Sequence, residues 1–119
     1  MAGSLTTHVL NIAQGQPGAG MGITLWRLDL ARGERQLLTS TRTNVNGRTD
    51  EPMLAGAEMM VGTYELVFAV GAYFNMQGIT DTALFLDHVP IRFRIAHADE
   101  HYHVPLLVSP WAYSTYRGS

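Results

Sequence analysis

The stretch HYHVPLLVSPWAYSTYRGS, residues 101–119, indicates the fold of this 119-residue chain most directly. It contains two runs of strand-forming residues on either side of Ser109-Pro110, and serine and proline are common in turns. The stretch therefore predicts two neighbouring strands joined by a turn. It also holds two histidines, three tyrosines and an arginine, although chain ends are usually frayed and tolerant of change. We therefore expect this terminal stretch to form part of a functional site.

Short strands separated by turn residues continue through the rest of the chain and predict an all-β sandwich or barrel. Strands are expected over residues 5–12, 22–30, 35–43, 64–70 and 89–95. A short helix followed by a loop is expected within residues 71–82. Asn46-Gly47 predicts a hairpin turn that places Arg48 at a strand end, because both turn residues accept positive φ. The core is expected to include Met53, Met59, Met60, Tyr64, Phe68, Tyr73, Phe74, Val89, Ile91, Phe93 and Ile95.

The composition sets broad limits on what the protein can be. The length predicts one domain, 1–119, with residues 1–4 as a flexible N-terminus. Charged residues make up only 15% of the chain, which favours oligomer interfaces, and the net charge of −2 argues against a nucleic-acid partner. The absence of cysteine excludes disulfides, thiolate metal sites and cysteine nucleophiles. No signal peptide or membrane-spanning run is predicted, so we expect no membrane partner and a cytoplasmic location.

Three histidines and one arginine are the first candidates for chemistry. His101 and His103 are two residues apart, so in a strand they point to the same face. Such a pair can supply two metal ligands or can perform acid–base catalysis near neutral pH. It can equally be part of a polar outer face. His8 lies in the first expected strand, and Arg48 could bind an anionic substrate or could be ordinary surface charge.

The chain resembles the 5-hydroxyisourate hydrolases, the enzymatic branch of the transthyretin-like proteins, in four segments: LTTHVL (5–10), NGRTD (46–50), HYHVPLL (101–107) and YRGS (116–119). The last segment usually distinguishes this enzyme from transthyretin itself. The resemblance implies a transthyretin-like eight-stranded β-sandwich with one short helix. It also implies a homotetramer, a dimer of dimers, whose active sites face a channel between the dimers.

The resemblance further implies an activity and a set of site residues. The expected reaction is hydrolysis of the purine-derived 5-hydroxyisourate to 2-oxo-4-hydroxy-4-carboxy-5-ureidoimidazoline in the degradation of urate to allantoin, without metal or cofactor. The expected catalytic residues are His8, Arg48 and His103. The expected substrate-binding residues are His101, Tyr116, Arg117, Gly118 and Ser119, so that the chain would end inside its own active site.

Two alternatives remain open from the sequence. One is a non-enzymatic carrier of small aromatic ligands of the transthyretin type, because a fold alone does not determine a function. The other is a zinc site built from His8, His101 and His103, since three histidines with an open position resemble a catalytic zinc centre.

Overall fold

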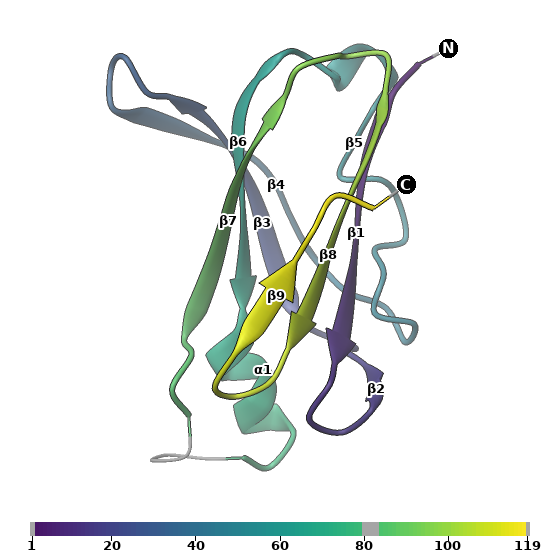
Figure 1. Ribbon diagram of the computed structural model, residues 1–119, viewed down its shortest axis with the longest axis vertical. Coiled ribbons are helices and arrows are strands. Elements are labelled where there is room, and N and C mark those ends of the chain that lie inside the picture. The colour runs from purple at the N-terminus through teal and green to yellow at the C-terminus, as the bar shows by residue number, and fades with distance from the viewer. Residues whose placement is uncertain (1, 80–83, 119) are drawn as a thin grey trace.

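The computed structural model describes residues 2–79 and 84–118, which form two packed β-sheets and one short α-helix (Figure 1). The elements in chain order are β1 (Ser4–Asn11), β2 (Gln16–Pro17), β3 (Gly22–Asp29), β4 (Glu34–Arg42), β5 (Leu54–Ala55), a 3₁₀ turn (Gly56–Glu58), β6 (Gly62–Ala69), α1 (Val70–Met76), β7 (His88–Ile95), β8 (His101–Val108) and β9 (Tyr113–Thr115). The all-β sandwich with one short helix is therefore confirmed. The last part of the loop expected up to residue 82 lies outside the described residues.

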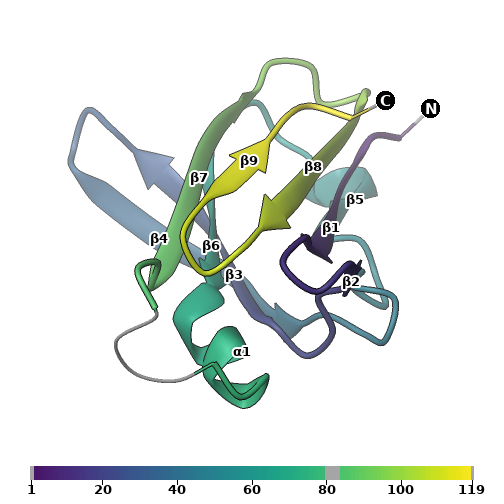
Figure 2. The same cartoon turned by 60° about the horizontal axis from the view of Figure 1, so that its bottom comes forward.

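The two sheets place distant parts of the chain side by side. One sheet has the order β2-β1-β8-β9, with β5 also paired to β1, and the other has the order β4-β3-β6-β7. Figure 2 shows the two sheets facing each other, with α1 at one end of the sandwich. Strands β1 and β8 pair in parallel, so Ser4 lies opposite His101 and Thr6 lies opposite His103. This pairing brings the N-terminal and C-terminal candidate residues onto one sheet.

Alternation of side chains along β1 separates the core from the outer face of this sheet. Leu5, Thr7 and Val9 are buried, whereas Thr6 and His8 are half-buried on the opposite face. This is the arrangement that the period of two predicts for a strand with one buried side. The outer face of the β1–β8 sheet is consequently where polar side chains can meet.

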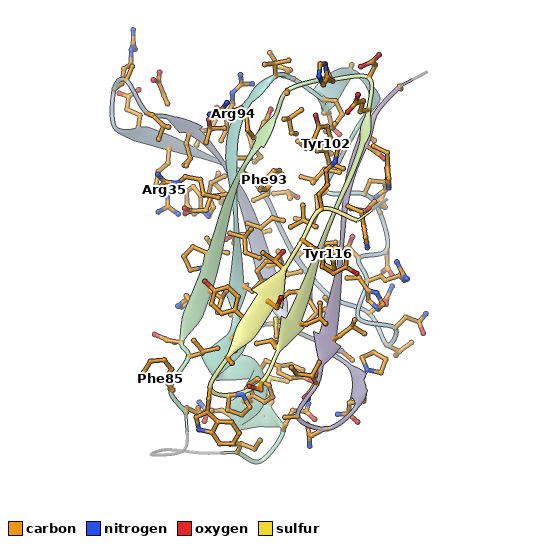
Figure 3. All side chains as sticks on the ribbon, in the orientation of Figure 1. Arg35, Phe85, Phe93, Arg94, Tyr102 and Tyr116 are labelled. Carbon is orange, nitrogen blue, oxygen red and sulfur yellow. The ribbon has the colours of Figure 1, made fainter. Side chains whose placement is uncertain are left out.

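The buried faces of both sheets meet in one hydrophobic core. Strand β7 contributes the alternating residues Val89, Ile91 and Ile95, and Phe93 packs against the core while partly exposed (Figure 3). Apolar surface removed from water in this way contributes about 25 cal/mol per Å² to folding. The expected core is confirmed except for Met60, which is 52% exposed. Met59 beside it is buried, because neighbouring side chains of an extended segment point in opposite directions.

The predicted turn at Asn46-Gly47 exists, but it does not join two strands of a hairpin. Gly47 has a φ of 77°, which is the left-handed conformation that the turn requires. However, β4 ends before the turn, and Arg48 after the turn forms a bridge with His8 of β1. The hairpin prediction was therefore wrong, and the segment instead crosses to the other sheet.

Candidate active site

The turn of residues 44–48 places Arg48 against the outer face of β1. The side-chain oxygen Oδ1 of Asn44 accepts hydrogen bonds from the backbone N–H groups of Asn46, at 2.9 Å, and Arg48, at 3.2 Å. The backbone N–H of Val9 donates to the carbonyl of Gly47 at 2.7 Å. These bonds fix the turn internally and attach it to β1, so the backbone of Arg48 is held beside His8.

His8 is held in a defined tautomer by the same turn. Its Nε2 lies 3.0 Å from the carbonyl oxygen of Asn46. A carbonyl oxygen can only accept, so Nε2 carries the proton and Nδ1 of the neutral ring is left with a lone pair. Partial burial, followed by the charge of Arg48, lowers the pKa of His8, and the bond to Asn46 opposes this only in part. His8 is therefore held in its neutral form near pH 7.

His103 occupies the neighbouring strand and is also held neutral. Its Nδ1 lies 2.8 Å from Oγ1 of Thr6, the residue opposite it on β1. Partial burial contributes most to lowering the pKa of His103, and the charges of Arg48, His8 and His101 lower it further. A neutral imidazole with a free nitrogen can accept a proton, which is what a general base must do.

The segment after β9 packs directly on the ring of His103. The backbone N–H of Gly118 donates to the carbonyl of His103 at 2.7 Å, and the two residues form an isolated bridge. A Cβ atom at position 118 would lie only 2.7 Å from Cδ2 of His103. Only glycine permits this close approach of the chain to the imidazole without moving one of the two.

Arg48, His103, His101 and Thr6 line one open hollow of about 490 Å³ on this face. Within residues 2–79 and 84–118, no carboxylate lies within salt-bridge distance of the Arg48 guanidinium. An arginine without such a partner can direct its planar set of donors to the oxygens of a ligand. The hollow therefore combines a neutral imidazole with a cation that can stabilise negative charge, and the acidic residues Asp50 and Glu51 also line it.

Of the other predicted site residues, His101 lines the hollow and the side chain of Arg117 lies away from it. His101 is exposed beside His103, and its Nδ1 contacts Oγ of Ser4. The Arg117 guanidinium lies 4.0 Å from the ring centroid of Tyr102 and donates a hydrogen bond to the backbone carbonyl of His101 at 3.0 Å. The side chain of Arg117 is thus not brought to the hollow beside His103.

Tyr116 is exposed and, together with Arg117, lines a separate hollow between β7 and the C-terminal segment (Figure 3). Ser119 lies outside the described residues. Among the described residues, the structure therefore brings together His8, Arg48, His103, His101 and the backbone of Gly118, but not the side chains of Tyr116 and Arg117.

Two residues that contribute to this geometry were missed in the sequence. Thr6 contacts both His101 and His103, and Asn44 organises the turn that carries Arg48. The signal for Thr6 was its place on the same face of the strand as His8. The signal for Asn44 was weaker, because asparagine is common in turns without any functional consequence.

The geometry does not support the zinc alternative. Among the part of the chain that the structure describes, no three His, Asp or Glu side chains are arranged to hold a metal ion. His101 and His103 instead have their Nδ1 atoms directed at the hydroxyls of Ser4 and Thr6. Zinc binding would require both rings to leave these contacts or to use their other nitrogens with a third ligand.

The fold and this site together define a class: a transthyretin-like β-sandwich that carries two neutral imidazoles and a guanidinium on the outer face of one sheet. The chain belongs to the HIUase/Transthyretin family, whose model matches residues 5–118. None of the helices among the described residues is long and apolar enough to cross a membrane.

Individual relatives are similar over the whole chain. The chain is 53% identical to the 5-hydroxyisourate hydrolase 2 of Rhizobium meliloti, covering 99% of this chain and 98% of that protein. It superposes on Klebsiella pneumoniae 5-hydroxyisourate hydrolase with a TM-score of 0.82 and 32% identity over the full length of both chains. It also superposes on (S)-allantoin synthase with a TM-score of 0.91 and 47% identity, covering 99% of this chain but only 44% of that larger chain.

Proposed function

We propose that the protein hydrolyses 5-hydroxyisourate to 2-oxo-4-hydroxy-4-carboxy-5-ureidoimidazoline without a metal or cofactor. The observation that carries this proposal is the position of Arg48, which forms a bridge with His8 and lines one hollow with His103, where burial and then the Arg48 charge lower the pKa of both histidines. The relatives reported above include two named 5-hydroxyisourate hydrolase at 53% and 32% identity over nearly the whole chain. The fold alone would support the carrier equally well, so the site residues decide between the two.

In the proposed reaction, Nε2 of His103 takes a proton from water. The resulting hydroxide oxygen forms a bond to a carbonyl carbon of the cyclic amide, and the ring C–N bond then breaks. The leaving nitrogen receives the proton back from His103, so the products are a carboxyl group and a ureido group. Acid–base catalysis by a positioned side chain typically contributes about 10²–10⁴-fold to the rate.

Arg48 has two roles in this proposal. Its guanidinium stabilises the negative charge that develops on the carbonyl oxygen, and such donors are each worth about 10²–10³-fold in rate. The same charge also disfavours protonation of His8 and His103, next to the larger effect of burial. One residue thus keeps the base neutral and stabilises the transition state.

The terminal residues complete the proposed substrate site. Gly118 allows the chain to pass close to the ring of His103. Arg117, through its contacts with Tyr102 and the carbonyl of His101, anchors this segment to β8. We assign Tyr116, Ser119 and His101 to substrate binding on the resemblance of this segment to the hydrolases.

We further propose the homotetramer, a dimer of dimers with its sites facing a channel. The edge strands β7 and β9 lie beside each other at one side of the sandwich (Figures 1 and 2). Trp111, Tyr113 and Tyr116 are large aromatic residues exposed close to this edge. Exposed edges and apolar side chains favour pairing with a second copy. Sedimentation velocity tests the assembly, and cell fractionation tests the cytoplasmic location, which stays a prediction from the sequence.

The activity is tested by generating 5-hydroxyisourate in situ from urate with urate oxidase. The protein should accelerate decay of this intermediate and yield the ring-opened product, identified by its ¹³C NMR spectrum. The activity should survive exhaustive chelation, and loss on chelation with recovery on adding zinc would contradict the metal-free mechanism. Unchanged decay, together with binding of small aromatic ligands, would favour the carrier instead.

A further inference from the structure

A line of four polar side chains crosses the outer face of the β1–β8 sheet. Oγ of Ser4 contacts Nδ1 of His101, and Oγ1 of Thr6 lies 3.5 Å from Nε2 of His101. The same Oγ1 lies 2.8 Å from Nδ1 of His103. The line follows from the parallel register, which places Ser4 opposite His101 and Thr6 opposite His103.

Thr6 determines which nitrogen of His103 is available for chemistry. A neutral imidazole has one N–H and one lone pair, and the partner of one nitrogen selects the state of the other. Because the Thr6 hydroxyl occupies Nδ1, a water in the hollow can reach only Nε2. For Nε2 to accept a proton, Nδ1 must carry the hydrogen and donate it to Oγ1 of Thr6.

The remaining members of the line are compatible with this direction of the hydrogen bonds. The hydrogen of the Thr6 hydroxyl is then directed to Nε2 of His101, at the long distance of 3.5 Å. His101 in turn donates from Nδ1 to Oγ of Ser4. The N–H groups of His103 and His101 and the Thr6 hydroxyl each have an acceptor in the line, whose last hydroxyl is that of Ser4, and His101 contributes by leaving a lone pair for Thr6.

We propose that Thr6 is a positioning residue that holds neutral His103 in its Nδ1–H tautomer and so leaves Nε2 free to act as the base. Thr6 acts through His103 and takes no part in bond making. The consequence for turnover rests on the proposed hydrolase function, whereas the tautomer of His103 is a property of the protein without substrate.

The tautomer can be read directly from the ring nitrogens by ¹H–¹⁵N NMR above the pKa of His103, with the signals assigned by comparison with His103→Gln. The wild-type ring should show the Nδ1–H pattern. Thr6→Val keeps the size of the side chain but removes the acceptor, so the spectrum should shift towards Nε2–H, which free histidine favours in water. Thr6→Ser should restore the wild-type pattern.

Thr7→Val is the matched control, because it makes the same change one position along β1. The Thr7 hydroxyl is buried on the other face and donates to the carbonyl of Val104 at 2.7 Å. Thr7→Val should therefore lower stability and leave the tautomer of His103 as it is. A purely structural effect of removing a threonine hydroxyl would appear in both variants.

The kinetic expectation is a fall in kcat of about tenfold for Thr6→Val with little change in KM, and recovery in Thr6→Ser, which corresponds to the loss of about one hydrogen bond. The proposal is overturned if wild-type His103 is in the Nε2–H form, or if Thr6→Val leaves the tautomer unchanged. A wild-type protein that shows the Nδ1–H pattern but does not act on 5-hydroxyisourate would contradict the proposed function and leave the positioning role intact.

Discussion

Replacing Gly118 by alanine should damage the site while leaving the fold intact. The new Cβ would lie 2.7 Å from Cδ2 of His103 and 3.4 Å from its Cβ and Cγ. To recover an ordinary contact of 3.4 Å, the ring would have to retreat by about 0.7 Å. Misplacing a catalytic group by about 1 Å can cost about 10²-fold in rate.

We therefore expect Gly118→Ala to lower kcat/KM by about 10- to 100-fold, which is about 1.4–2.7 kcal/mol of transition-state stabilisation. Gly22→Ala is the matched control, because its Cβ would meet only the Cβ of Ala69 at an ordinary 3.6 Å. The assay is decay of 5-hydroxyisourate made in situ, alongside urea denaturation of both variants. If Gly118→Ala retains full activity with a native denaturation curve, the close packing on His103 has no functional role.

Three further predictions concern the charges and the turn. Arg48→Gln removes a cation that lowers the pKa of His103, so the acid limb of the pH profile of kcat/KM should move to higher pH. An unmoved limb would show that the charge of Arg48 does not affect the pKa of the catalytic base. The pKa values of His8 and His103 are lower in the folded protein than in the unfolded chain, so the stability they contribute is present above about pH 6.5 and is lost as pH falls through their folded values. Urea denaturation should therefore show that the free energy of unfolding falls towards pH 5. The fall should be less steep when both histidines are replaced by glutamine. Asn44→Ala should cost about 1 kcal/mol of stability and raise KM, because it removes the two hydrogen bonds that Oδ1 accepts within the turn and the one that Nδ2 donates to Asp50; unchanged KM would show that the turn is held by other contacts.

The local strand pattern was predictable from the sequence because it depends on neighbouring residues. The alternation of Val89, Ile91 and Ile95 predicted the buried face of β7 correctly. The prediction that Met60 is buried was wrong because the apolar run around it has no clear period, and only its neighbour Met59 is buried in the structure. The turn at Asn46-Gly47 was correct locally, but where the chain goes after the turn depends on the bridge to His8.

The sequence predicted a set of residues for the site, but it did not predict how they are arranged relative to one another. The outward direction of His8, and of His101 and His103 together, followed from the period of two. The parallel pairing of β1 with β8 joins positions almost one hundred residues apart, and no local period encodes it. The contact of Thr6 with His103 depends on this register, so it became visible only in the structure.

The most direct test of the account is the first-order decay of 5-hydroxyisourate with equal amounts of wild-type protein and of His103→Ala. The wild type should accelerate decay strongly, and the variant, folded and in the same oligomeric state, should lose about 10²–10⁴-fold of this acceleration. Equal acceleration by both proteins would show that His103 does not activate the water.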